Sequence, residues 1–175
     1  MALIGRRYPG ARSGARDRRI RAIEEDLPVP RRVGYAPGVY DLFHIGHLNI
    51  LRRAAGLCDV LIAGVVSDEM AALAKGRPPV VPLEERLEIV SSVRFVDRAV
   101  AERQPDKLLM WEELRFDVLF KGDDWLGTPK GAKLERDMHG VGVDVAYLPY
   151  TVHTSSTVLR RALDALLQPD PEGVS

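Results

Sequence analysis

The chain has 175 residues, 46% of them hydrophobic and 29% charged, and its formal net charge at pH 7 is zero. This size and composition indicate one globular domain with a hydrophobic core, and the balanced charge argues against a general affinity for nucleic acid or anionic membranes. The single cysteine, Cys58, excludes an internal disulfide and is typical of a cytoplasmic protein, and no apolar run approaches the ~18 residues that span a bilayer.

The first stretch, residues 1–32, is rich in arginine, glycine and proline and poor in apolar positions. This composition predicts a flexible basic arm, within which a short helix over 17–27 remains open because Pro28 and Pro30 would end it. An organellar transit peptide is the alternative, although serine is scarce and an acidic residue appears by Asp17. We expect a cytoplasmic protein with this arm, one domain over 33–168 and a tail over 169–175.

From Val33 onward, short apolar runs alternate with amphipathic stretches. In chain order the pattern predicts a strand at 33–40, a helix at 45–55, a strand at 60–66, helices at 68–74 and 82–93, a strand at 99–101, a helix at 106–114, a strand at 117–120, a helical segment at 130–139, a strand at 143–148 and a helix at 155–167. This alternation predicts an α/β fold with a parallel sheet covered on both faces. Because such sheets bind ligands beyond the carboxyl ends of their strands, we expect the chemistry just after the first strand.

Two histidines follow that first strand. His44 and His47 are three residues apart and share one face of the first helical turn, where free N–H groups and the helix dipole attract phosphate. Gly38 and Gly46 flank them and let the backbone approach a ligand closely. The pair predicts a cradle for a phosphate that gains charge during reaction. A zinc site is the alternative, but no third ligand of suitable spacing is evident.

At these residues the sequence resembles the cytidylyltransferase family, whose signature reads G-x-F-D-x-x-H-x-G-H. The matching positions are Gly38, Asp41, His44, Gly46 and His47, with Tyr40 in place of the phenylalanine. The resemblance spans roughly Val33 to Leu167. It implies a Rossmann-like doubly wound parallel sheet forming a single nucleotidyltransferase domain.

A loop with two cations, Lys75 to Val80, follows the helix predicted at 68–74. Charge on a loop is often only a solvated surface, but a transferring phosphoryl group needs cations to neutralise its oxygens. The loop resembles the lysine-glycine-proline loop of phosphocholine and phosphoethanolamine cytidylyltransferases. Glu85-Arg86 and Arg94-Phe95-Val96-Asp97 likewise resemble a segment shared with bacterial glycerol-3-phosphate cytidylyltransferases. These resemblances imply that Lys75 binds the substrate phosphate, that Arg77 binds the CTP phosphates and that Arg94 forms part of the site wall.

The segment Lys121-Gly122-Asp123-Asp124-Trp125 lies directly after a predicted strand. It resembles the G-D-D-W segment of bacterial glycerol-3-phosphate cytidylyltransferases, and this implies a nucleotide-binding role for Asp123. Adjacent aspartates hold magnesium through water in other sites, and a simple turn cap is the alternative for one of the pair.

Hydroxyl side chains gather where the last predicted helix begins. One of them is expected to be an ordinary helix cap, and the others suit the β- and γ-phosphates of a nucleotide. The family's version of this segment is R-T-x-G-I-S-T-T. Thr151, Ser155 and Thr157 match and Ser156 replaces a threonine, whereas Tyr150, His153 and Thr154 replace arginine, glycine and isoleucine. The lost guanidinium puts the identity of the acceptor in doubt more than the type of reaction.

The resemblance as a whole implies a CTP-dependent cytidylyltransferase that uses Mg²⁺, acts on a small phosphorylated or phosphonate acceptor and pairs as a homodimer. The catalytic residues would be His44, His47 and Lys75, and the acceptor would contact Asp41, Lys75, Arg94 and His153. The nucleotide would contact the remaining positions, Gly38, Val39, Tyr40, Gly46, Arg77, Asp123, Thr154, Ser155, Ser156 and Thr157.

Two other functions stay open on the sequence alone. The histidine motif is shared with adenylyltransferases that use ATP on a phosphorylated cofactor precursor, although the Lys75 loop and the G-D-D-W segment argue against that use. A non-catalytic nucleotide-binding protein is the other alternative, suggested by the altered Tyr150–Thr154 segment and opposed by the intact His44 and His47.

Overall fold

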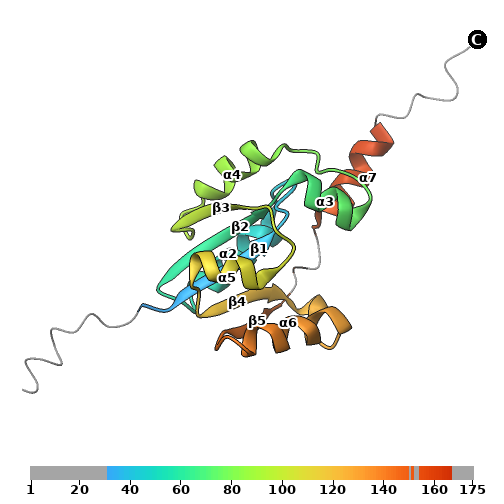
Figure 1. The fold of residues 1–175 in the computed structure, drawn as a ribbon. Coiled ribbons are helices and arrows are strands. Elements are labelled where there is room, and N and C mark those ends of the chain that lie inside the picture. The colour runs from blue at the N-terminus through green and yellow to red at the C-terminus, as the bar shows by residue number, and fades with distance from the viewer. Residues whose placement is uncertain (1–30, 150, 152–153, 167–175) are drawn as a thin grey trace, which may run out of the picture. The chain divides into compact units, whose positions relative to one another are not determined.

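The core of the computed structural model is a parallel sheet whose strands lie in the order β3-β2-β1-β4-β5 (Figure 1). The structure describes residues 31–149, 151 and 154–166, and within them the sheet has five strands. Their bounds are β1 Val33–Gly38, β2 Val60–Val66, β3 Arg98–Glu102, β4 Val118–Gly122 and β5 Asp144–Leu148.

The strand order reverses at β1. This strand pairs with β2 on one side, with Val33 opposite Val60, and with β4 on the other, with Gly34 opposite Val118. The strands that follow β1 in the chain therefore lie first on one side of it (β2 and β3) and then on the other (β4 and β5), as in a doubly wound sheet. The carboxyl ends of β1 and β4 form the switch point at which such folds bind ligands.

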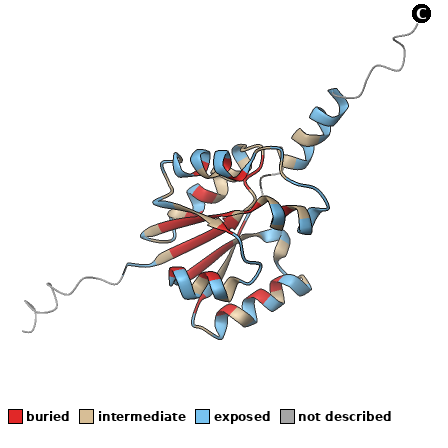
Figure 2. Ribbon diagram, turned by 45° about the horizontal axis from the view of Figure 1, so that its top comes forward, coloured by how far each residue is buried: buried red, intermediate tan, exposed pale blue. Residues whose placement is uncertain are grey.

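Helices cover both faces of the sheet, and the strands between them are buried (Figure 2). One core cluster contains Leu51 and Ala54 of α2 with Leu83 and Val90 of α4, and the other contains residues of α5 and α6. None of the helices in the described part of the chain is long and apolar enough to span a membrane. The helix bounds are α2 Ile45–Ala55, α3 Asp68–Lys75, α4 Leu83–Ser91, α5 Lys107–Leu114, α6 Pro129–His139 and α7 Ser156–Leu166, with a 3₁₀ turn, η1, at Asp123–Trp125.

These observations confirm the predicted Rossmann-like α/β fold, and the differences concern element ends. Lys75, expected to open a loop, is the last residue of α3, because Gly76 with φ 74° provides the left-handed cap that ends the helix. Strand β4 extends two residues beyond the expected end because its pairing with β5 continues to Gly122 opposite Leu148. The helix considered over 17–27 lies outside the described residues.

Candidate functional site

His44 caps the amino end of α2, directly beyond the carboxyl end of β1. Its Nδ1 accepts a hydrogen bond from the Gly46 N–H at 3.0 Å, so in the neutral ring the proton sits on Nε2. That Nε2 lies 3.3 Å from Ser156 Oγ, whose hydroxyl donates to the Asp41 carbonyl at 2.7 Å. A directed chain of hydrogen bonds therefore links α2, α7 and the loop after β1.

His47 lies one turn further along α2, with its ring stacked on that of His44 at a centroid distance of 4.0 Å. Burial first, and then His44 and Lys75, lower the pKa of His47 to about 3, and burial also lowers the pKa of His44. Both rings are therefore neutral near pH 7. Within the described residues, His47 Nδ1 is the one buried side-chain nitrogen or oxygen atom without a hydrogen-bond partner.

The loop between β1 and α2 has an unusual backbone. Tyr40 and Leu42 adopt positive φ angles of 55° and 48°, a conformation that side chains disfavour. The Tyr40 hydroxyl, absent from the phenylalanine of the family signature, donates to the Ala36 carbonyl at 2.8 Å. A Cβ atom at Gly46 would lie 2.7 Å from the His44 ring, so glycine is needed there for the ring to fold back over the helix start.

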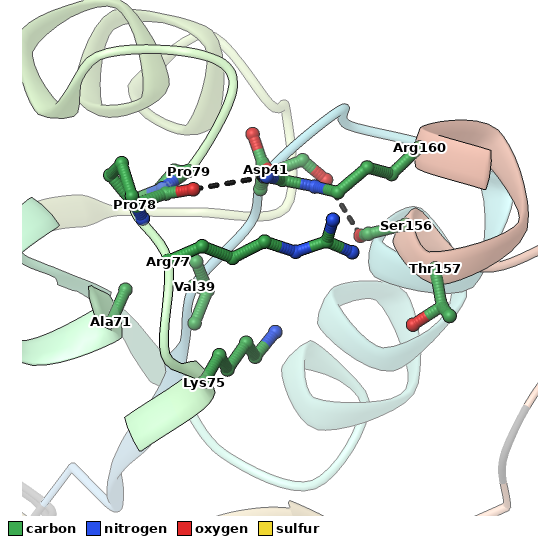
Figure 3. Close-up of a pocket in the computed structure, with 10 residues that line it drawn as sticks. All are labelled: Val39, Asp41, Ala71, Lys75, Arg77, Pro78, Pro79, Ser156, Thr157 and Arg160. Carbon is green, nitrogen blue, oxygen red and sulfur yellow. Dashed lines mark hydrogen bonds and ion pairs between the residues drawn. The ribbon is translucent and has the colours of Figure 1, made fainter. Parts of the chain in front are cut away.

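Two adjoining cavities lie in front of the histidines. The larger, of about 180 Å³, is lined by His44, His47, Lys75 and the first residues of α7. The smaller, of about 50 Å³, is lined by Val39, Asp41, Arg77 and Arg160 among others, and it shares Lys75, Ser156 and Thr157 with the larger. Figure 3 shows Lys75 and Arg77 reaching from the end of α3 and the loop after it toward α7. Segments far apart in the sequence thus form one phosphate-sized, cation-lined crevice.

Asp41 joins the walls of this crevice. Its Oδ1 accepts from the N–H groups of Val80 and Val81 at 2.9 and 3.0 Å, and its Oδ2 accepts from the Arg160 guanidinium at 2.5 Å. Burial alone would raise the pKa of Asp41, but the hydrogen bonds from Val81, Arg160 and Val80 outweigh it and lower the pKa. Both carboxylate oxygens are thus engaged within the protein, and the contact of Asp41 with an acceptor remains a prediction.

Arg160 is a site residue that the sequence reasoning missed. Besides Asp41 it binds the Pro78 carbonyl at 3.0 Å, so it ties α7 to the loop that carries Arg77. The sequence signal that could have indicated Arg160 is its position on α7 one turn after Ser156, which places both residues on the same helix face. An arginine on a predicted amphipathic helix is, however, usually a solvated residue, and nothing in the pattern pairs it with an aspartate 119 positions earlier.

The hydroxyl cluster at α7 divides into separate tasks. Ser155 Oγ accepts from the Val158 N–H at 3.2 Å, which makes Ser155 the helix cap. Ser156 binds the Asp41 carbonyl, and Thr157 is exposed and lines both cavities. The first turn of α7 therefore faces the crevice with a hydroxyl and helix N–H groups, an arrangement suited to phosphate.

Other predicted residues lie elsewhere. Arg94 precedes the amino end of β3, at the sheet edge opposite the histidines, where its guanidinium lies 4.7 Å from the Phe95 ring centroid. Asp123 begins η1 directly after Gly122, which lines the larger cavity. Tyr150 and His153 lie outside the described residues. Arg94 therefore lies apart from the predicted residues that line the crevice.

The donor groups do not form a metal centre by themselves. The described part of the chain contains no group of three or more histidine, cysteine, aspartate or glutamate side chains placed to hold an ion. The carboxylate that lines the crevice, Asp41, is already bound by Val80, Val81 and Arg160. The described residues therefore do not form a multi-ligand metal site on their own, and Mg²⁺ bound through a nucleotide remains a prediction.

The neutral state of His47 predicts an acid-sensitive stability. Between pH 6.5 and 3 the unfolded chain binds a proton on this residue and the folded chain does not, so stability falls as the pH falls through that window. From pH 6.5 to 5 the contribution is up to about 2 kcal/mol. Urea unfolding at both pH values should show this loss in the wild type and a smaller loss in His47→Gln. An unchanged loss in the variant would contradict the assignment, and His139→Gln, at an exposed position on α6, is the control.

Comparison with known proteins adds relatives of two kinds. The profile of the cytidylyltransferase-like family matches residues 35–162. The chain is 39% identical over 107 residues to ethanolamine-phosphate cytidylyltransferase of Arabidopsis thaliana, a match that covers 58% of this chain and 25% of the plant protein. It is also 37% identical over 114 residues to FAD synthase of Pyrococcus abyssi, covering 65% of this chain and 77% of that protein. The chain thus spans about a quarter of the first relative and about three quarters of the second.

A solved structure supports the same fold. The lipopolysaccharide core biosynthesis protein from Thermoplasma volcanium superposes with a TM-score of 0.60 at 25% identity, over 71% of this chain and 99% of that one.

Proposed function

The chain belongs to the cytidylyltransferase-like family of nucleotidyltransferases, and from this premise we propose that it transfers CMP from CTP to a small phosphorylated alcohol or phosphonate and releases pyrophosphate. The observation that carries the proposal is the stacked, neutral His44–His47 pair facing Lys75 across the crevice at the start of α7. The neutral histidine rings can donate hydrogen bonds, and the Lys75 ammonium supplies positive charge. A phosphoryl group in transfer is stabilised by both kinds of group.

The proposed step is an in-line displacement. A phosphate oxygen of the acceptor attacks the α-phosphorus of the nucleotide, a new P–O bond forms, and the bond to the β-phosphate breaks with its electrons leaving on pyrophosphate. Negative charge is held on the oxygens of the α-phosphoryl group during the transfer. His47 donates to these oxygens, and His44 does so by turning its Nε2–H from Ser156 Oγ to the phosphoryl group. Lys75 and Arg77 neutralise the phosphates. The residues act by positioning and electrostatics, without a covalent intermediate.

The start of α7 is proposed to hold the leaving group. Its free N–H groups, the exposed Thr157 hydroxyl and the positive end of the helix dipole all favour the β- and γ-phosphates. Arg160 is already bound to Asp41 and Pro78, so we assign it to fixing the distance between α7 and the Arg77 loop. Lys75 and Arg77 are exposed, and Arg77 would exchange its ion pair with Asp164 of α7, at 3.3 Å, for a bound triphosphate.

The choice of CTP is supported by the similarity to ethanolamine-phosphate cytidylyltransferase and by the Lys75 loop and G-D-D-W segments. A second candidate is adenylyl transfer from ATP, favoured by the match to FAD synthase, which covers a larger share of the relative. Magnesium, pairing as a homodimer and a cytoplasmic location remain predictions of the proposed enzyme.

Pyrophosphate release tests the proposal. The full chain is incubated with CTP or ATP and magnesium across a panel of phosphorylated alcohols, phosphonates and riboflavin phosphate, and pyrophosphate is measured. We expect release with CTP and at least one phosphorylated alcohol or phosphonate, and none without an acceptor. Turnover with ATP but not with CTP would contradict the proposal and favour adenylyl transfer. Silence with both nucleotides, together with binding of either one, would favour a nucleotide-binding protein without catalysis.

A further inference from the structure

A separate cavity of about 400 Å³ lies on the α5/α6 face of the sheet, at the carboxyl end of β4. Neighbouring residues of a strand point to opposite faces. Gly122 accordingly lines the histidine cavity, whereas Lys121 lines this one, together with Lys107, Lys130, Trp125 and Leu134. Among the described lining residues none is shared with the histidine crevice, so the two sites lie back to back across the end of β4.

Of the two lysines near the buried Glu102, one forms an ion pair with it and the other does not. Glu102 at the end of β3 is buried, and its two oxygens accept from the Tyr35 hydroxyl at 2.5 Å and from the Lys107 ammonium at 2.7 Å. Lys107 therefore neutralises Glu102. Lys121 lies beside this pair without a carboxylate within 4.0 Å among the described residues.

The contact that Lys121 does make is weaker than an ion pair. Its ammonium lies 4.4 Å from the centroid of the Trp125 ring. A cation–π contact stabilises an ammonium group less than an ion pair with a carboxylate does. Burial first, and then Lys107, lower the pKa of Lys121 to about 8, against the opposing effect of Glu102 and Asp124. The half-buried cation thus has Glu102 and Asp124 in its surroundings but makes no ion pair within the described residues.

A second lysine of the cavity is also without an ion pair. Lys130 at the start of α6 is exposed and has no carboxylate within 4.0 Å in the part of the chain that the structure describes, whereas Lys133 is paired with Asp137. The cavity thus offers two ammonium groups that make no ion pair within the described residues, beside the apolar surface of Pro105, Trp125 and Leu134 and near the Asp106 carboxylate. A dianion attached to a flat apolar group matches both features.

We propose that this cavity is a second binding site, for a small aromatic phosphate monoester whose phosphate pairs with Lys121 and Lys130 and whose ring packs against Trp125 and Leu134. The site is distinct from the nucleotide-transfer crevice and does not depend on the function proposed for that crevice.

Calorimetric titration of the full chain with phenyl phosphate tests this site. Inorganic phosphate supplies the charge without the ring, and phenol the ring without the charge, so both should bind more weakly. Lys121→Met should weaken phenyl phosphate at least about 10-fold, the scale of one charge-assisted hydrogen bond. Lys133→Met, which removes a lysine already paired with Asp137, is the matched control and should bind within about 3-fold of wild type.

Two further arms keep the test decisive. Lys75→Met should leave the affinity unchanged, and loss of binding in that variant would place phenyl phosphate in the histidine crevice and overturn the proposal. Lys121→Arg should retain binding, which separates a loss of charge from a failure to fold. Wild-type affinity in Lys121→Met, or no binding of phenyl phosphate to the wild type, would also overturn it.

The pH dependence gives an independent readout. Above pH 8 Lys121 loses its proton, so the wild-type affinity should fall about 10-fold by pH 9, whereas Lys121→Arg should keep its affinity. An affinity that is flat between pH 7 and 9 in the wild type would contradict the role of Lys121. The charged groups that face it are Glu102 from β3, Asp106 and Lys107 at the start of α5, Asp124 from η1 and, across the cavity, Lys130, Lys133 and Asp137 from α6.

Discussion

His47→Ala is expected to lower turnover by a factor of about 100 or more, the scale for losing one transition-state donor, while the protein remains folded. His47 is held in place by the stacked His44 ring, by an edge contact with Tyr40 and by a tilted contact with Phe43. Its Nδ1 has no hydrogen-bond partner within the described residues. A buried polar atom without a partner is costly, and the His47 ring lines the larger cavity, where the reacting phosphate is proposed to lie. The measurement is kcat for pyrophosphate release with the preferred nucleotide and acceptor.

Controls separate chemistry from packing. His139→Ala removes an exposed histidine on α6 and should leave kcat unchanged. His47→Gln keeps an N–H donor and should recover part of the activity that alanine loses. Near-normal turnover in a folded His47→Ala protein would remove His47 from the proposed mechanism. A loss confined to KM would assign His47 to ground-state binding instead.

The fold was largely predictable because its signals are local. The continuous apolar run 60–66 predicted a buried parallel strand, and it forms β2 beside the centre of the sheet. Element ends were less predictable because they depend on pairing and capping. The end of β4 is set by its partner β5, and the end of α3 by the left-handed conformation of Gly76. The strand order is a tertiary property that periodicity does not encode.

The candidate site was predictable where a motif is compact and unpredictable where contacts are distant. The motif from Gly38 to His47 and the hydroxyl cluster indicated the crevice, and the structure brings His44, His47, Lys75 and Ser156 together. Arg160 binds an aspartate 119 positions earlier in the chain, and a contact between such distant segments arises only in the folded structure. Arg94 shows the converse, since its similarity to a family segment suggested the crevice and the chain places it at the opposite edge of the sheet.

Arg86→Met is expected to cost about 3–5 kcal/mol of stability, because it leaves three carbonyl groups without their donor at about 1–3 kcal/mol each. The Arg86 side chain is fully buried beneath the crevice, on α4. It donates to the carbonyls of Val81 at 2.8 Å, Val39 at 2.5 Å and Val66 at 2.8 Å, and it pairs with the Asp68 carboxylate. One guanidinium thus fastens the ends of β1 and β2 to the loop before α4.

Methionine fills a similar volume but supplies no donor, so three carbonyl groups and a carboxylate would lose their partner. Because a domain of this size is stable by about 5–15 kcal/mol, such a loss should be visible as a large shift of the urea midpoint at constant slope. Arg98→Met, at an exposed arginine that begins β3, is the matched control and should change stability by less than about 0.5 kcal/mol.

The same substitution should also affect the crevice, because Val39 and the loop that ends at Val81 carry its walls. A variant with Lys at position 86 keeps a charge but not the planar fork, and it should fall between the wild type and Arg86→Met in stability. A loss below about 1 kcal/mol in Arg86→Met would mean that water replaces the guanidinium at these carbonyls. In that event the position of Val81 would depend chiefly on the hydrogen bonds that Asp41 accepts from the Val80 and Val81 N–H groups, and Asp41→Asn would become the more damaging change.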